Sequence, residues 1–254
     1  MSAGYHLFAL IRTDAVLPAP LPAGLEGGSV VLLSAGPVTA VAQAVTTHFV
    51  ARLQQDNGAE SERAWLTERL LEHERVVESF ATLAPAFPLG FGVLLADPSA
   101  LQTAIVPHAS SLSDFFARAV GHQEWSLKFF LREQAPKRGE MAVAARSGLE
   151  YLAARHALPE RAAAREAAGR EFVENVLKSL SPFYDDIVVN KSGAAPDRDL
   201  RLLANIALLV PTREQEALIS KVQAFLAIAE TQDMELTLTG PWPLYSFRPS
   251  ITLG

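Results

Sequence analysis

Cysteine is missing from this chain of 254 residues. Its absence excludes a disulfide framework, a thiolate metal site and a cysteine nucleophile, and it is typical of proteins from a reducing cytosol. Positive charge is also scarce, because 22 Lys and Arg stand against 28 Asp and Glu for a net charge of −6. This balance disfavours nucleic acid as a partner. Hydrophobic residues make up 49% of the chain, which is enough for a sizeable core and excludes intrinsic disorder as the main state.

A continuous apolar segment that could cross a membrane is lacking as well. Residues 27–51 contain no Asp, Glu, Lys or Arg and are long enough to span a bilayer. Gly36-Pro37 interrupts them, however, and the pattern instead predicts the strands Val30–Ser34 and Val38–Ala42 joined by a turn. The first residues carry no positive charge before their apolar run, so no secretory signal is expected. We therefore expect a cytoplasmic protein without a membrane partner.

Motifs that carry chemistry are missing too. Gly90-Phe91-Gly92 lacks the third glycine and the lysine of a phosphate-binding loop, and no G-x-S-x-G sequence is present. His73 stands among glutamates, but no second histidine follows at helical spacing, so the zinc-binding HExxH pattern is absent. Because His73 lies on the apolar stripe of its predicted helix and Glu74 and Glu78 lie off it, a packing role is favoured over a metal ligand or general base. We predict no catalytic residue, no metal and no cofactor, and hence no enzyme.

The elements expected in the first 131 residues describe an α+β domain. In order they are a strand at Tyr5–Ile11, the hairpin of residues 30–42, a helix from Ser61 to Ala84, a central strand at Phe87–Leu95, a broken helix that begins at Asp97-Pro98, and a strand at Glu124–Phe130. The long helix is expected to bury one face, formed by Leu66, Leu70, His73, Val77, Phe80 and Ala84. This order of strand, hairpin, helix and strand is close to a ferredoxin-like sandwich.

The second half predicts another α+β domain. From Lys137 to about Ser179 the composition shifts to Ala, Arg and Glu, which is typical of a long exposed helix or helix pair, and Pro159 is expected to divide it. The remaining elements are strands at Asp186–Lys191, Leu202–Val210 and Met234–Thr239, and a helix that starts at Thr212. The expected domains are therefore a ferredoxin-like domain at 1–135 and, at 136–254, a domain with a long helical region and an antiparallel sheet.

Four segments of the chain carry a resemblance to a known family. They are LLEHERVVE at 70–78, FPLGFG at 87–92, EWSLK at 124–128 and TGPWPLYSF at 239–247. In this order and spacing they resemble the gas vesicle protein family F/L (GvpF/GvpL), whose marks are a histidine in the first long helix, a P-[L/M]-R-F-G strand, an E-W-x-x-K strand and a terminal G-P-W-P-P-Y-S-F. Gly90 stands where the family usually has arginine and Leu244 replaces its second proline, so the subgroup, F or L, stays open.

The resemblance implies a function in gas vesicles, as a cytoplasmic accessory protein or a minor structural component of the vesicle. Its implied partner is the small, strongly apolar shell protein, with other accessory proteins as further partners. A shell protein that assembles by strand pairing exposes aggregation-prone surface until it is assembled. A protein that shields it or seeds its assembly needs a sheet edge or an apolar patch, and no catalytic group. The alternative is a small-molecule or haem-binding enzyme on a ferredoxin-like sheet, with His73 as the ligand.

Partner contacts are expected on an open edge of the N-terminal sheet and in the aromatic tail. An open antiparallel edge can pair with a strand of the shell protein and satisfy its N–H and C=O groups. In the tail, two prolines keep the chain extended and display the aromatic side chains, and packing of these rings onto the protein's own core is the alternative. The predicted contact residues are Phe87, Leu89, Phe91, Trp125, Leu127, Phe129, Trp242, Tyr245 and Phe247.

Overall fold

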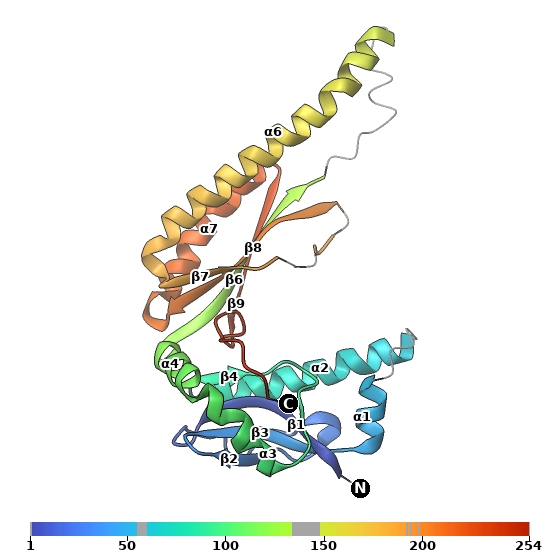
Figure 1. The fold of residues 1–254 in the computed structure, drawn as a ribbon. Coiled ribbons are helices and arrows are strands. Elements are labelled where there is room, and N and C mark those ends of the chain that lie inside the picture. Colours follow the sequence, from blue (N-terminus) through green and yellow to red (C-terminus); the bar gives the residue numbers. More distant parts are fainter. Residues whose placement is uncertain are drawn as a thin grey trace. The chain divides into compact units, whose positions relative to one another are not determined.

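The structure is a computed structural model that describes residues 2–54, 60–133, 148–191, 193, 195–197 and 199–253. The chain forms two compact units (Figure 1). The first unit contains residues 1–123 and 241–254, and the second contains residues 124–240. No helix among the described residues is both long enough and apolar enough to span a bilayer.

The first unit is built on one antiparallel sheet. Its strands are β1 (Ser2–Arg12), β2 (Val31–Ala35), β3 (Val38–Thr46) and β4 (Ala86–Pro88), in the order β2-β3-β1-β4, and the short β5 (Leu94–Leu95) also pairs with β1. The predicted hairpin is confirmed, because β2 and β3 pair from Val31↔Ala42 to Ala35↔Val38 across a tight turn. Gly36 supplies the positive φ of 63° that this turn requires.

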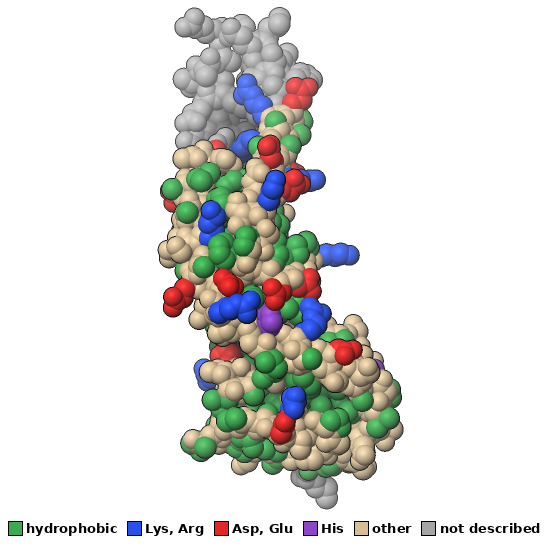
Figure 2. Space-filling model, turned by 90° about the vertical axis from the view of Figure 1, so that its left-hand side faces the viewer, with side chains coloured by type: hydrophobic (Ala, Val, Ile, Leu, Met, Phe, Trp, Pro, Cys, Tyr) green, Lys and Arg blue, Asp and Glu red, His purple; other side chains and the backbone are tan. Residues whose placement is uncertain are grey.

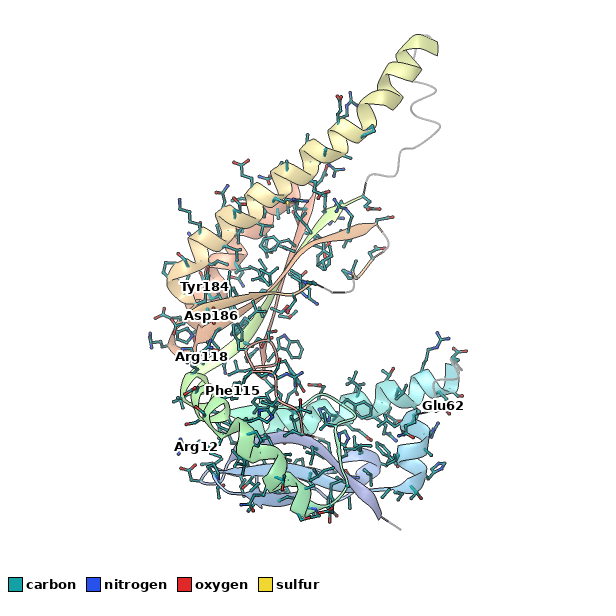
Figure 3. All side chains as sticks on the ribbon, viewed as in Figure 1. Arg12, Glu62, Phe115, Arg118, Tyr184 and Asp186 are labelled. Carbon is teal, nitrogen blue, oxygen red and sulfur yellow. The ribbon has the colours of Figure 1, made fainter. Side chains whose placement is uncertain are left out.

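Helices cover both faces of this sheet. They are α1 (Thr47–Gln54), α2 (Glu60–Ala81), α3 (Pro98–Ile105) and α4 (Ala109–Ala119), with 3₁₀ turns at η1 (Leu25–Gly27) and η2 (Val106–His108). Phe8, Val41 and Ala86 of the strands share one core with α2. The next residue, Phe87, therefore points to the opposite face, where its ring meets Phe115 of α4 at 4.9 Å between centroids (Figure 3).

The predicted central strand at Phe87–Leu95 is wrong. β4 and β5 take only parts of it, and both lie on the outer side of β1 rather than in the middle of the sheet. Pro88 has no N–H to continue a ladder, and Gly92 turns the chain with a φ of 90°. The segment between them stays beside β1, since the N–H of Leu89 donates to the carbonyl of Phe8 at 2.9 Å.

The buried face of α2 begins differently from the predicted stripe. Leu70 is 44% exposed, whereas Trp65 and Arg69 are buried. From His73 to Phe80 the stripe is as predicted, but α2 ends at Ala81, so Ala84, predicted as its last member, lies outside the helix and is only half-buried. The difference arises because Arg69 is buried among carboxylates, whereas a pattern based on residue type assigns arginine to the surface.

The second unit has the complete strand–helix–strand–strand–helix–strand order of a ferredoxin-like sandwich. Its elements are β6 (His122–Arg132), α6 (Gly148–Leu180), β7 (Asp186–Val189), β8 (Leu200–Pro211), α7 (Gln215–Thr231) and β9 (Met234–Trp242), with 3₁₀ turns at η3 (Ser181–Phe183) and η4 (Thr212–Glu214). The strand order is β7-β8-β6-β9. Leu127 of β6, Val176 of α6 and Leu218 of α7 are fully buried in its core. The predicted α+β class with antiparallel sheets is confirmed.

α6 is continuous where the sequence predicts a break. The helix passes through Pro159 on its way from Gly148 to Leu180. A proline inside a helix removes one backbone hydrogen bond, and a long helix absorbs this loss with a local bend. The helix start predicted at Lys137 lies outside the described residues.

The two units differ from the predicted division at 135/136 in two places. β6, expected in the first domain, lies in the second sheet, where the N–H of Arg132 donates to the carbonyl of Asp233 at 2.9 Å. The tail from Pro241 to Gly254, expected in the second domain, belongs to the first unit. Both differences have one cause: the partner of a strand or tail lies far away in the sequence, and local patterns do not reveal it.

Candidate functional site

Two histidines are hydrogen-bonded to each other in the core of the first unit. His6 lies on β1 and His73 on α2, and both are fully buried. His6 Nε2 lies 2.9 Å from His73 Nδ1, and His73 Nε2 lies 3.0 Å from the carbonyl oxygen of Leu89. The rings of Phe8 and Phe91 pack against the pair. The pair thus joins β1, α2 and the segment that follows β4.

The partners of this pair determine where its protons lie. A carbonyl oxygen only accepts, so His73 Nε2 donates to Leu89, and a neutral ring then leaves Nδ1 to accept from His6 Nε2. Burial lowers the pKa of His73 to about 4, and burial together with the neighbouring ring lowers the pKa of His6 to about 3. Both rings are therefore neutral at pH 7. His6 Nδ1 has no hydrogen-bond partner among the described residues.

Both nitrogens of His73 are engaged in these bonds, so neither offers a lone pair for a metal or haem. This geometry disfavours the haem-ligand alternative for His73. The described residues also contain no group of three or more His, Asp and Glu side chains placed to hold a metal ion. The geometry is that of a packing histidine in a hydrogen-bonded core pair.

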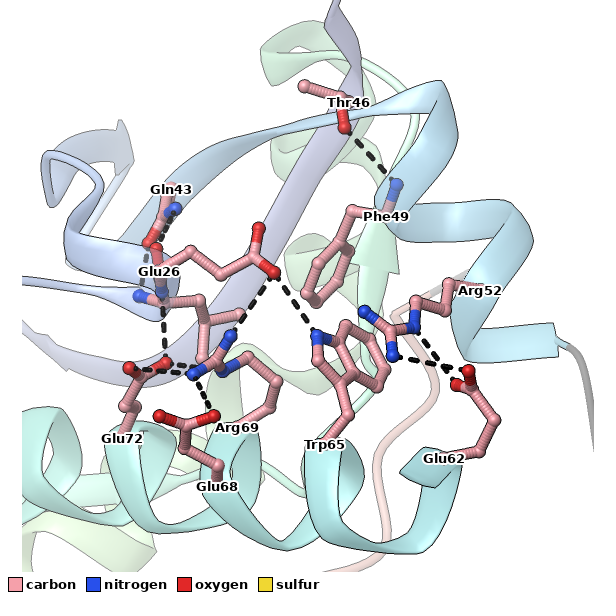
Figure 4. Close-up of polar contacts among 11 residues, drawn as sticks. Glu26, Gln43, Thr46, Phe49, Arg52, Glu62, Trp65, Glu68, Arg69 and Glu72 are labelled. Carbon is pink, nitrogen blue, oxygen red and sulfur yellow. Dashed lines mark hydrogen bonds and ion pairs between the residues drawn. The ribbon is translucent and has the colours of Figure 1, made fainter. Parts of the chain in front are cut away.

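A second polar cluster surrounds Arg69 on α2 (Figure 4). Its guanidinium belongs to a side chain that is only 8% exposed, and it forms ion pairs with Glu26 at 3.1 Å, Glu68 at 2.8 Å and Glu72 at 2.7 Å. Glu26 also accepts a hydrogen bond from Trp65 Nε1 at 3.2 Å. Three carboxylates around one buried guanidinium offset the cost of taking its charge out of water.

This cluster fastens the loop of residues 24–28 to α2. Glu26 has a φ of 53°, and its N–H donates to Glu72 at 2.9 Å. Gln43 of β3 holds Leu25 through two bonds, accepting from its N–H at 2.7 Å and donating to its carbonyl at 2.9 Å. Leu25 itself is buried in the core beneath α2. No sequence pattern pairs these residues, and the glycines that flank Leu25 and Glu26 are the one local sign of a loop with a specific conformation.

The C-terminal tail packs against the first unit beside β4. The hydroxyl of Tyr245 donates to the carboxylate of Glu74 at 3.0 Å, and Nη1 of Arg248 donates to the carbonyl of Pro88 at 2.7 Å. The guanidinium of Arg248 also lies over the Tyr245 ring, 5.4 Å from its centroid. Burial raises the pKa of Glu74, and burial together with the Glu74 carboxylate raises the pKa of Tyr245. The tail therefore occupies the β4 side of the sheet.

A pocket of about 740 Å³ lies between the tail and the segment after β4. Gly90, Tyr245 and Arg248 are among the residues that line it. A Cβ atom at Gly90 would meet no other atom within 4 Å. The pocket thus brings together two of the segments that carry the family resemblance, 87–92 and 239–247, and it has room for a larger side chain at Gly90.

A second pocket, of about 550 Å³, lies between the start of β3 and α4. Val38, Leu112 and Phe116 contribute to its apolar wall, and Arg12 and Asp14, which form an ion pair of 2.7 Å, contribute to its polar lining. Figure 2 shows hydrophobic side chains gathered on a face of the first unit. A pocket with a mostly apolar wall and a few polar groups is the usual form of a binding site for a small apolar group.

Five of the nine predicted contact residues lie in the two cores. Phe87 and Leu89 are buried in the first unit, and Trp125, Leu127 and Phe129 are buried in the second. Their side chains pack against their own unit and are at most 6% exposed.

The other four predicted residues lie closer to the surface. Phe91, Tyr245 and Phe247 are half-buried, the first against the histidine pair and the second against Glu74. Trp242 is 43% exposed. The structure therefore brings Phe87, Leu89 and Tyr245 to one pocket of the first unit, whereas Trp125, Leu127 and Phe129 belong to the core of the second unit.

Fold and polar clusters together define a protein of two α+β units related to the ferredoxin sandwich, in which buried polar side chains hold distant segments of the first unit together. Residues 4–249 match the family described as gas vesicle synthesis protein GvpL/GvpF. Because this match covers nearly the whole chain, the chain belongs to that family.

Solved structures of gas vesicle proteins have the same fold. The structure of GvpF from Anabaena sp. PCC7120 is similar with a TM-score of 0.68 and 17% sequence identity, over 99% of this chain and 98% of that chain. The structure of GvpF from Microcystis aeruginosa is similar with a TM-score of 0.65 and 17% identity, over 97% of this chain and 99% of that chain. No curated protein sequence matches this chain.

Proposed function

We propose that this protein is a non-enzymatic assembly protein of gas vesicles that binds the small apolar shell protein. The observation that carries the proposal is the family match over residues 4–249, since the family is described by gas vesicle synthesis. The resemblance implies a shell protein that is apolar and assembles by strand pairing. Unassembled copies of such a protein aggregate unless a partner shields them or places them on the growing vesicle.

Two features of the structure support a binding role. In the first unit, His6, His73 and Arg69 contact other segments of the same unit, so their polar groups stabilise the fold. The first sheet ends in the edge strand β2, which pairs with one neighbour among the described strands. Such edges are the places at which a further strand can add to a sheet.

Co-expression of the tagged full-length chain with the shell protein tests the binding. We expect the shell protein to elute with the tagged chain, because its apolar strands are stabilised by contact with it. An unrelated tagged protein of similar net charge serves as the control. If the shell protein elutes neither with the tagged chain nor with the control protein, although the shell protein and the tagged chain are both expressed, the proposal is contradicted.

Deletion of the gene tests the assembly role separately. Cells without the protein are expected to hold fewer complete vesicles in electron micrographs, and a plasmid copy should restore them. Fractionation of the complemented cells should recover the protein from the cytoplasm and from isolated vesicles. Normal vesicle numbers in the deletion strain would argue against a role in assembly.

A further inference from the structure

β2 has the composition of an interior strand but lies at the edge of the first sheet. It pairs with β3, and no other described strand pairs with it. Leu32 packs against the core beneath α2, while Val31 and Leu33 alternate to the opposite face, so both faces of the strand are apolar. All three side chains are only half-buried. Strands that are apolar on both faces are typical of sheet interiors, where neighbours cover them.

The hydrogen-bond pattern of β3 determines which groups of β2 are bonded. The N–H of Thr13 donates to the carbonyl of Pro37 at 3.2 Å. This bond makes Arg12 and Val38, which lie opposite each other on β1 and β3, a non-hydrogen-bonded pair. Val38 therefore directs its N–H and C=O toward β2, where its partner is Ala35.

Alternation along β2 then leaves two residues facing outward. Val31 and Leu33 have the same orientation as Ala35 and bond to β3. The N–H and C=O groups of Leu32 and Ser34 point away from β3, and no other part of the described chain is hydrogen-bonded to them. The edge thus presents two donors and two acceptors with the spacing of a β-strand.

The other sheet edges carry features that hinder strand addition. β4 is short and contains Pro88, whose carbonyl is bonded to Arg248. β7 has four residues and begins with the exposed Asp186, and β9 contains Pro241. Residues 27–51, by contrast, contain no charged side chain, so the β2 edge lacks the charges and prolines that protect natural sheet edges.

We propose that β2 is the docking strand on which an apolar strand of the shell protein adds to the first sheet. This docking rests on the function proposed above and locates its contact. The four outward backbone groups require an extended partner. The uncharged edge selects an apolar one, because a charged side chain placed beside Val31 and Leu33 would lose its hydration without gaining an ion pair.

Capture of the shell protein by full-length variants tests the docking strand. Ser34→Pro removes one outward N–H and spares the bonds to β3, and Val31→Lys adds a charge to the edge. Each is expected to lower the captured amount of shell protein about tenfold or more. Val189→Lys is the matched control, because it is the same substitution at a 64% exposed position of β7, and it should leave capture unchanged.

Amide hydrogen exchange of the unmodified chain provides a readout that does not depend on how the variants fold. When the shell protein binds, the exchange rates of the Leu32 and Ser34 amides are expected to fall at least about tenfold. The amide of Leu33 is bonded to β3 already and should change little.

The outcomes separate the docking strand from the proposed function. Normal capture by folded Ser34→Pro and Val31→Lys chains, or unchanged exchange at Leu32 and Ser34, would overturn the docking strand alone. Variants that alter the chain's own oligomeric state without losing capture would assign β2 to a second copy of the chain, which also overturns it. If the unmodified chain captures no shell protein, the proposed function fails, and the docking strand with it.

Discussion

The two units have the same strand order but differ in the connection between their first two strands. The orders β2-β3-β1-β4 and β7-β8-β6-β9 correspond strand by strand. In the second unit β6 and β7 are connected through α6, a helix of 33 residues. In the first unit β1 and β2 are connected by a loop whose only helical element is the 3₁₀ turn η1. The strand order of the sheet therefore does not require a helix between the first and second strands.

One leucine and a charged cluster take the place of that helix in the first unit. α6 places Phe172 and Val176 in the core of the second unit. The loop places Leu25 in the core of the first unit, and bonds from Gln43 and the Arg69 cluster hold it there. A helix satisfies its own backbone groups, but a loop needs partners from elsewhere. The first unit thus depends on contacts between distant segments, and the second on packing along one helix.

Acid is expected to have the largest effect and to distinguish the units. Burial holds the pKa of His6 at about 3 and that of His73 at about 4, below the ordinary 6.5, so the unfolded chain binds protons more readily than the folded first unit. The contribution of the two rings to the free energy of unfolding is complete above pH 6.5. It decreases as the pH falls toward 4, by up to about 1.4 kcal/mol per pH unit for each ring. Hydrogen exchange at about pH 5 should show β1 opening while β8 stays protected.

The double variant His6→Phe, His73→Leu is the control for the acid effect. It removes both titrating rings, so the stability of its first unit should depend much less on pH. Equal loss of protection in β1 and β8 on acidification, or no loss in either, would show that the histidine pair does not distinguish the units.

Truncation of Leu25 is expected to have the next largest effect. Leu25→Ala removes the side chain with which the loop fills the first core, and we expect a loss of about 3 kcal/mol in the free energy of unfolding, measured with urea. Leu21→Ala in the same loop is the control, since Leu21 is 38% exposed, and it should cost about 0.5 kcal/mol or less. Equal small costs would mean that the loop does not replace a helix.

Removal of the buried guanidinium is expected to cost somewhat less. Arg69→Met leaves the partly buried carboxylate of Glu72 without its cation, and we expect a loss of about 2 kcal/mol. Glu26 and Glu68 remain largely hydrated, which keeps the cost below that of a fully buried pair. Amide hydrogen exchange at residues 24–28 should be faster in this variant. Arg75→Met, at an exposed position of the same helix, is the control, and an equal effect there would contradict the role of the cluster.

Loss of one hydroxyl in the tail is expected to have the smallest effect. Tyr245→Phe keeps the ring under Arg248 but removes the bond to Glu74, and we expect a loss of about 1 kcal/mol with faster exchange in residues 241–253. Tyr184→Phe in the second unit is the control, because the Tyr184 hydroxyl makes only a long bond of 3.4 Å to a neutral carbonyl. Unchanged exchange in the Tyr245→Phe tail would mean that packing alone holds it.

The tail also bears on how the protein can be divided for experiments. A fragment cut at the predicted boundary near residue 135 would lack Tyr245 and Arg248, which bond to Glu74 and Pro88 of the first unit. It would also carry β6 without the sheet to which that strand belongs. Full-length variants are therefore the better test of where the shell protein binds.

The sequence by itself determined the features that depend on neighbouring residues. Gly36-Pro37 between apolar runs predicted the β2–β3 hairpin, and Asp97 before Pro98 predicted the start of α3, where its side chain accepts from the N–H groups of Ser99 and Ala100. The α+β class and the family resemblance also followed from patterns read along the chain. Side-chain periodicity and cap chemistry act within a few residues, so they are visible in a sequence.

Only the tertiary structure decided which distant segments meet. It paired His6 with His73, which lie 67 positions apart, and Tyr245 with Glu74, which lie 171 positions apart. It also assigned β6 to the second sheet and buried Phe87, Leu89 and the β6 aromatics that the sequence offered as partner contacts. An apolar residue has the same pattern whether it packs inside its own unit or binds a partner. The choice depends on the shape and hydrogen bonding of segments that come together only when the chain folds.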